Sequence, residues 1–188
     1  MRRTALSACF FLSCAAMAQE LPDRCVSAIR RALGSSATWR MERRLEGGAR
    51  PLVSTGVVSC VVSRGIEWKV LHPFPLSVGM TTDSMVFVDE EGRRVKPLSD
   101  LPYYEDIRER TDAFARGDVK AFDGLFELES EICPGGGWKI VLTPQMRAMR
   151  HLFTAMEISG GETVDKVSLK TEKGGVSDIV FRESPRER

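Results

Sequence analysis

The chain has 188 residues, which is the size of one ordinary domain. Its 27 Lys and Arg residues nearly balance its 26 Asp and Glu residues, and the formal net charge is +1, so the basic excess typical of nucleic-acid-binding proteins is missing. The hydrophobic fraction of 43% is sufficient for a packed core and argues against a disordered chain.

The N-terminus has the layout of a secretory signal peptide. The basic pair Arg2-Arg3 precedes an apolar stretch over residues 5–18, which is shorter than the ~20 residues that cross a bilayer. Ala16 and Ala18 are small residues at the two positions that a signal peptidase recognises. We expect cleavage after Ala18, which leaves residues 19–188 as a single exported domain that does not span a membrane.

Two other sorting signals fit this segment less well. Phe11-Leu12-Ser13-Cys14 is similar to a lipoprotein cleavage box, but Phe11 occupies a position where Leu is usual. The arginine pair could begin a twin-arginine signal, but Thr4-Ala5-Leu6 does not continue that pattern. We therefore expect removal of the whole signal rather than lipidation at Cys14.

Three cysteines remain after removal of the signal: Cys25, Cys60 and Cys133. They allow one disulfide and one free thiol, with three pairings that the sequence does not rank. A zinc site is not expected, because these cysteines are far apart in the chain and only His72 and His151 could add nitrogen ligands. We expect no metal and no cofactor.

The mature chain is expected to begin with a helix and to continue in strands. Helical spacing of the apolar residues predicts a helix over residues 21–33, which Gly34 ends. The apolar period then changes from 3.6 to 2, so Trp39 and Met41 share one face of a half-buried strand over residues 39–46.

Further strands are expected wherever alternating apolar residues are bounded by Gly, Pro, Asp or Ser turns. They cover residues 52–62, 66–70, 76–80, 85–88, 93–96, 125–132, 138–142, 151–158, 164–170 and 176–182. Residues 104–123 break this pattern and predict two short helices, separated by Gly117-Asp118. Short loops between neighbouring strands favour an antiparallel sheet, and about eleven strands would curl into a barrel or half-barrel.

A catalytic arrangement is not found in the sequence. There is no G-x-S-x-G motif, His72 lies at a strand end before Pro73, and His151 is expected to open a strand. A dyad of Cys133 with either histidine is a weaker interpretation than a structural cysteine. The glycines 135–137 lack the Ser or Thr and the helix of a phosphate-binding loop. We therefore expect a protein that is not an enzyme.

Apolar residues are the remaining candidates for function. Methionine adapts its shape and is common on surfaces that accept flexible apolar partners. Any single one of the mature chain's methionines is explained by ordinary core packing, but together they indicate a soft interior, which in a half-barrel is suited to a lipid. These residues are Met41, Met80, Met85, Met146, Met149 and Met156.

Several segments follow the pattern of one protein family. A signal peptide is followed by one helix and then by an aromatic-x-Gln strand, here Trp39-Arg40-Met41. The other matching segments are Pro51–Gly56, Arg64–Trp68, Pro73-Phe74-Pro75, Trp138–Pro144 and Val176–Phe181. On these segments nearly the whole mature chain resembles the periplasmic outer-membrane lipoprotein carrier (LolA-like) family, in its shorter divergent branch.

The resemblance implies a mainly β (α+β) fold, an unclosed antiparallel half-barrel of about eleven strands with a lid of about three short helices. It implies a periplasmic carrier, or chaperone, that shields the acyl chains of a lipoprotein or other lipidic cargo in an apolar cavity between the inner and outer membranes. An inner-membrane release complex and an outer-membrane acceptor are the implied partners, and we expect a monomer. Two alternatives are a lipid-sensing regulatory module on the same fold and, less well supported, a periplasmic hydrolase.

The alternation of apolar residues selects the side chains that would line such a cavity. On the strands these are Trp39, Met41, Trp68, Val70, Met80, Met85 and Phe87. From the lid side they are Phe114, Phe122 and Phe126. Gly117 would act as a hinge between the two short lid helices.

The chain departs from the family at two positions. Met41 stands where the family usually has Gln, and the family's functional Arg near the end of the second strand falls at Val62 here. Arg64, two residues further on, is our candidate for coupling cargo to release, and a solvated turn residue is the alternative interpretation.

Overall fold

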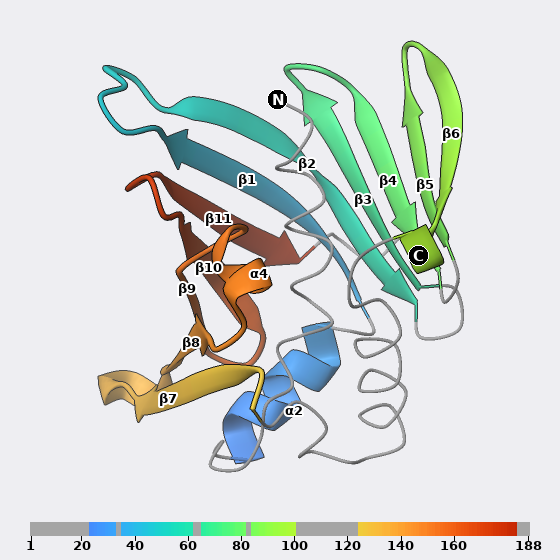
Figure 1. Cartoon of the computed structure of the whole chain (residues 1–188). Helices are drawn as coiled ribbons and strands as arrows, with labels where there is room; N and C mark the ends of the chain where they lie inside the picture. The colour runs from blue at the N-terminus through green and yellow to red at the C-terminus, as the bar shows by residue number, and fades with distance from the viewer. Residues whose placement is uncertain (1–22, 33–34, 62–64, 82–83, 101–123, 184–188) are drawn as a thin grey trace.

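The computed structural model describes residues 23–32, 35–61, 65–81, 84–100 and 124–183. These residues form one antiparallel sheet with a helix beside it (Figure 1). The strands are β1 (Ser36–Arg44), β2 (Leu52–Val61), β3 (Gly65–His72), β4 (Leu76–Met80), β5 (Ser84–Asp89), β6 (Gly92–Pro97), β7 (Phe126–Ile132), β8 (Trp138–Pro144), β9 (Ala155–Gly160), β10 (Val164–Lys170) and β11 (Val176–Glu183). The helices are α2 (Asp23–Ala32) and the single turn α4 (Arg147–Arg150), with 3₁₀ turns η1 (Leu98–Asp100) and η2 (Pro134–Gly136).

The strands follow one another across the sheet in the order β6-β5-β4-β3-β2-β1-β11-β10-β9-β8-β7. β1 pairs with β11, so the first and last strands of the chain meet at the centre of the sheet. In the described residues β6 and β7 are the two edges, and the sheet is curved but unclosed (Figure 1). The predicted eleven-stranded, antiparallel, unclosed sheet is therefore confirmed.

The helical part of the predicted fold is only partly found. The helix predicted over residues 21–33 is α2, but a lid of three short helices is not seen in the ranges that the structure describes. The two helices expected within residues 104–123 lie outside those ranges.

One predicted strand begins in the wrong place. It was expected to start at His151, but α4 and the turn after it precede β9, which begins at Ala155. The reason is a helical pattern of apolar residues: Met149 and Phe153 are buried four positions apart, and the Phe153 amide donates to the Met149 carbonyl.

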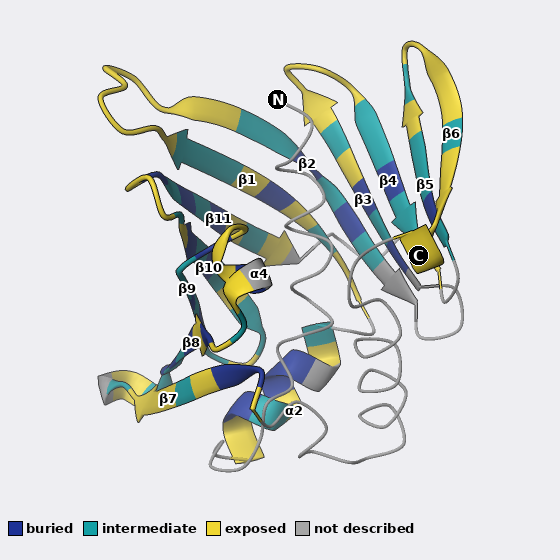
Figure 2. Ribbon diagram, in the orientation of Figure 1, coloured by how far each residue is buried: buried dark blue, intermediate teal, exposed yellow. Residues whose placement is uncertain are grey.

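The core lies on the inner face of the sheet, which is the face toward α2 and α4. Cross-strand partners share a face, so the register extends this face from β7 to β5 through pairs such as Ile179 with Val167 and Trp68 with Val78. Figure 2 shows buried positions alternating with more exposed ones along the strands, as expected for a sheet with one wet face.

α2 forms because its apolar residues recur at helical spacing along one face, while the opposite face is polar. Cys25, Ala28 and Ile29 are buried at positions i, i+3 and i+4, and Asp23 places a negative charge in the first turn. α2 packs on β10, and Arg24 donates a hydrogen bond to the carbonyl of Gly136 in η2. These contacts fix α2 over the β7–β11 half of the sheet.

Candidate functional site

Two tryptophans stack at the centre of the inner face. Trp39 comes from β1 and Trp68 from β3, with ring centroids 4.6 Å apart and planes at 25°. Both side chains are nearly inaccessible, at 3% and 2% of their full exposure. Phe181 of β11 meets the edge of the Trp68 ring, with centroids 6.2 Å apart and planes at 85°. The result is an aromatic cluster that joins strands on both sides of β1.

Gly56 makes this stacking possible. It pairs with Trp39 in the register of β1 and β2, and β2 lies between the strands that carry the two tryptophans. A Cβ atom at Gly56 would lie 2.5 Å from Cζ2 of Trp39 and 1.8 Å from the carbonyl oxygen of Lys69. The absence of a side chain therefore lets the Trp39 ring lie over β2.

Half-buried apolar residues surround the tryptophan pair. They belong to β1, β3, β4 and β5 and pack against the buried core without being buried themselves. They are Met41, Val70, Leu76, Met80 and Phe87. Methionine and phenylalanine dominate this set, so its surface is apolar and adaptable.

The other half of the inner face is packed more completely. α2 packs on β10 and α4 on β8, over strands whose inward residues are fully buried (Figures 1 and 2). Trp138, Ile140, Leu142, Met156 and Ile158 are each 2% exposed or less. Most of the partly buried apolar residues that pack against the core thus belong to β1–β5, although Leu128, Val164 and Phe181 belong to the other half.

One polar atom of the inner face lacks a partner. The indole Nε1 of Trp39 is buried and makes no hydrogen bond within the part of the chain that the structure describes. The corresponding atom of Trp138 donates to the carbonyl of Gly161 at 2.8 Å.

The structure brings most of the predicted lining residues together. Trp39, Met41, Trp68, Val70, Met80, Met85 and Phe87 all lie on the inner face of β1–β5. Phe126 was expected on the lid side, but it is the first residue of β7 and packs beside Phe153, with ring centroids 6.1 Å apart. Arg64, Phe114, Gly117 and Phe122 lie outside the described residues.

Sequence reasoning missed three members of this face: Gly56, Leu76 and Phe181. Leu76 and Phe181 obey the same alternation as their strands, so the signal was present for both. Gly56 gave no signal of its own, because its role depends on a ring contributed by the neighbouring strand.

Groups suited to binding a metal ion do not gather in the described residues. No cluster of three or more His, Cys, Asp or Glu side chains is found there. Cys25 and Cys133 are free, and burial raises the pKa of the Cys25 thiol, which disfavours a reactive thiolate. No helix among the described residues has the length and apolar character needed to cross a membrane.

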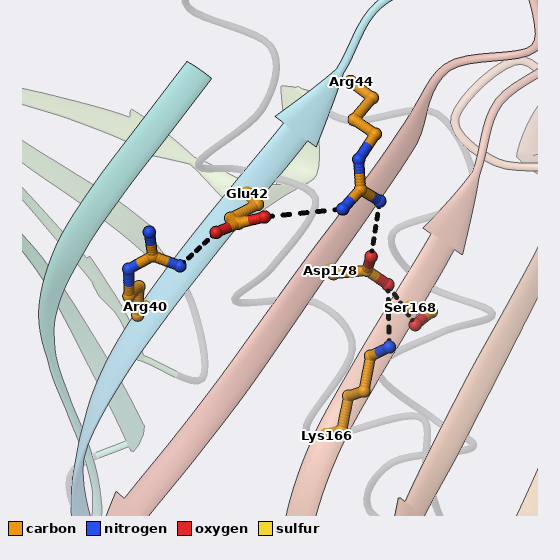
Figure 3. Close-up of polar contacts among 6 residues, drawn as sticks. All are labelled: Arg40, Glu42, Arg44, Lys166, Ser168 and Asp178. Atoms are coloured by element: carbon orange, nitrogen blue, oxygen red, sulfur yellow. Dashed lines mark hydrogen bonds and ion pairs between the residues drawn. The ribbon is translucent and has the colours of Figure 1, made fainter. Parts of the chain in front are cut away.

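The outer face carries an ordered cluster of charges across β1, β11 and β10 (Figure 3). Asp178 is its centre: it accepts from Ser168 Oγ at 2.6 Å, and lies 3.1 Å from Lys166 Nζ and 3.0 Å from Arg44 Nη1. Glu42 joins Arg44 to Arg40. Partial burial alone would raise the pKa of Asp178, but these donors outweigh it and lower the pKa below its usual value.

We expect Asp178→Asn to lower the free energy of unfolding at pH 7 by about 1–2 kcal/mol, because it removes the carboxylate that two cations share. Because the folded-state pKa is depressed, the carboxylate stabilises the fold above its unfolded pKa of about 4, and this contribution is lost as the pH falls through the folded-state pKa. Urea unfolding at pH 7 and at about pH 3 measures the free energy of unfolding of wild type and variant. The difference between the two free energies should be smaller at the acidic pH. Glu131→Gln, which breaks the exposed pair with Lys139, is the control and should cause no measurable change. A difference that persists unchanged in acid would contradict this account.

No protein-family model matches the sequence, and no curated protein matches it. Several solved structures have a similar fold. A LolA superfamily protein from Nitrosomonas europaea is 10% identical, with a TM-score of 0.38 over 81% of this chain and 86% of that one. A putative outer membrane lipoprotein-sorting protein domain from Vibrio parahaemolyticus is 12% identical, with a TM-score of 0.38 over 85% of this chain and 91% of that one.

The MucA/MucB complex of Pseudomonas aeruginosa is 14% identical in the matched chain, with a TM-score of 0.46 over 88% of this chain. This chain spans 58% of that one. The first of these structures is described as a LolA superfamily protein and the second as a putative lipoprotein-sorting domain.

Proposed function

We propose that this protein is a periplasmic carrier that binds the acyl chains of a lipoprotein or another lipidic cargo on the inner face of β1–β5. The observation that carries the proposal is the half-buried apolar surface around Trp39 and Trp68, on the half of the sheet away from α2 and α4. A core that needed no further occupant would bury these side chains as fully as Ile140, Leu142 and Met156 of β8 and β9.

The physical need for a carrier follows from the hydrophobic effect. Each methylene group exposed to water costs about 0.8 kcal/mol, so an acyl chain does not leave a membrane at a useful rate without an apolar surface to receive it. Met41, Met80 and Phe87 give a surface that fits chains of different shape. An adaptable surface also favours release, because it does not bind one shape with maximal affinity.

The remaining parts of the proposal come from the sequence. The signal peptide over residues 1–18 would export the protein to the periplasm, where lipids cross between two membranes. We keep Phe114, Phe122 and Gly117 as the cargo-facing residues and hinge of a lid, and Arg64 as the residue that couples cargo to release. None of these assignments includes a catalytic step.

A charge placed on the inner face should abolish cargo binding. We expect Val70→Glu to weaken the binding of a fluorescent fatty acid at least tenfold, because a carboxylate would have to be buried beside the acyl chain. Leu71→Glu is the matched control: Leu71 is the next residue of β3, lies at the irregularity in the pairing with β2 and is 48% exposed. Its affinity should equal that of wild type. Equal affinities for both variants, in proteins with unchanged circular dichroism, would place the ligand elsewhere.

The natural cargo is best identified by mass spectrometry of ligands extracted from protein purified from its own periplasm. Co-purified acylated molecules are expected. A transfer assay to acceptor vesicles then distinguishes a carrier, which delivers the cargo, from a sensing module, which binds the cargo and retains it while engaging a regulatory partner. Absence of any lipid from freshly purified protein, together with no binding of the fluorescent fatty acid, would refute the proposal.

A further inference from the structure

Trp39 buries a hydrogen-bond donor that the described chain does not satisfy. Its side chain is 3% exposed, and its Nε1 has no acceptor in the described residues. An unsatisfied buried donor loses its hydrogen bond to water without replacement, and most buried polar atoms in proteins are paired for this reason. Trp138 follows the rule, with its Nε1 only 2.8 Å from the Gly161 carbonyl. The exception at Trp39 therefore calls for a physical reason.

The position of the ring explains why the sheet does not supply an acceptor. Cε2 of Trp39, the carbon bonded to Nε1, lies 2.8 Å from the Cβ position at Gly56, so the edge of the ring that carries the N–H lies over β2. The backbone of β2 is paired with β1 on one side and with β3 on the other. The register of β2 with β3 shifts between Thr55 and Gly56, and no described group, the Ser54 hydroxyl on this face included, accepts a hydrogen bond from Nε1.

The neighbours of this donor are those expected around an acyl chain. In the register, Phe181 and Gly56 flank Trp39, and Val70 follows Gly56 on β3. Met41 lies two residues along β1, on the same face. A single N–H thus sits among side chains that, apart from Ser54 opposite Met41, are apolar, and some of them are half-buried.

We infer that Trp39 Nε1 donates a hydrogen bond to the carbonyl oxygen of an acyl ester in the bound cargo. This inference rests on the proposed function and adds to it a polar anchor, which selects acyl lipids over lipids with the same chain but no carbonyl. An indole N–H is a donor only, so its partner must be an acceptor, and an ester carbonyl oxygen is one. The apolar residues would bind the chain, the side chains that cover Nε1 would move aside, and Trp39 would fix the position of the cargo's carboxyl end.

The test compares two lysophosphatidylcholines that differ only at this oxygen: 1-dodecanoyl, an ester, and 1-dodecyl, an ether. Calorimetric titration below the critical micelle concentration of each should show the wild-type protein binding the ester about five- to tenfold more tightly, as one hydrogen bond of about 1 kcal/mol or slightly more requires. Replacement of Trp39 by 3-benzothienylalanine keeps the ring shape and exchanges the N–H for sulfur. The ester preference should then disappear, while the affinity for the ether stays the same.

The same replacement at Trp138 is the matched control. Its N–H is satisfied within the protein, so the ester preference should be unchanged even if stability falls. In ¹⁵N spectra the indole proton of Trp39 should shift downfield on binding the ester and not on binding the ether. Equal binding of ester and ether by the wild type, or an ester preference retained by the Trp39 analogue, would overturn the inference but leave a lipid carrier. Binding of neither probe would instead count against the proposed function.

Discussion

Gly56→Ala is expected to lower the free energy of unfolding by about 3 kcal/mol or more, or to prevent folding. The added methyl group would lie 1.8 Å from the Lys69 carbonyl oxygen and 2.5 Å from the Trp39 ring. The first neighbour is backbone held in a sheet ladder and the second is a buried indole, so neither can move aside cheaply. Urea unfolding followed by tryptophan fluorescence measures the loss.

Gly79→Ala is the matched control within the same sheet. A Cβ atom at Gly79 would have no neighbour closer than Cβ of Val86 at 3.9 Å, which is an ordinary contact. Its stability should stay close to that of wild type, because only the crowding at Gly56 distinguishes the two glycines. Similar losses for the two variants would show that the effect comes from alanine in a strand and not from the tryptophan stack.

The strands were predictable because each has one face exposed to solvent, which gives an alternation of polar and apolar residues. In β1 the exposed Arg40 alternates with the buried Trp39 and the half-buried Met41, and such alternation has no other simple explanation. The helix α4 was missed because it has only one turn, and the apolar residues Met149 in α4 and Phe153 just after it lead directly into those of β9. Over so short a stretch the helical period of 3.6 residues and the strand period of 2 residues are difficult to distinguish.

The sequence was sufficient to predict which residues of the candidate site share one face of the sheet, but not how their side chains pack together. Period 2 assigned Trp39 and Trp68 to the same side of their strands. It could not show that the two rings stack, because strand register and the gap at Gly56 arise only when β1, β2 and β3 are paired. The orphaned indole N–H is a further consequence of that packing, since it depends on what lies around the ring rather than on the residue itself.

The division of the inner face also depends on tertiary packing. α2 covers the β7–β11 half because Cys25, Ala28 and Ile29 reach the core there. The sequence contains equally apolar strands in both halves, so their different burial could not be read from composition. This asymmetry separates the stabilising half of the sheet from the half that we propose to bind cargo.

Phe153→Ala is expected to cost about 3–5 kcal/mol of the free energy of unfolding, because it removes a fully buried aromatic ring. Phe153 is 0% exposed, stacks on Phe126 of the edge strand β7 and ties the turn after α4 to the core. Leu152→Ala is the control, since the adjacent Leu152 is 51% exposed and should contribute little. If the β7–β11 half only supports the fold, Phe153→Ala protein that is still folded at low temperature should bind a fluorescent fatty acid with wild-type affinity. A loss of affinity larger than the loss of folded protein would show instead that cargo contacts both halves of the sheet.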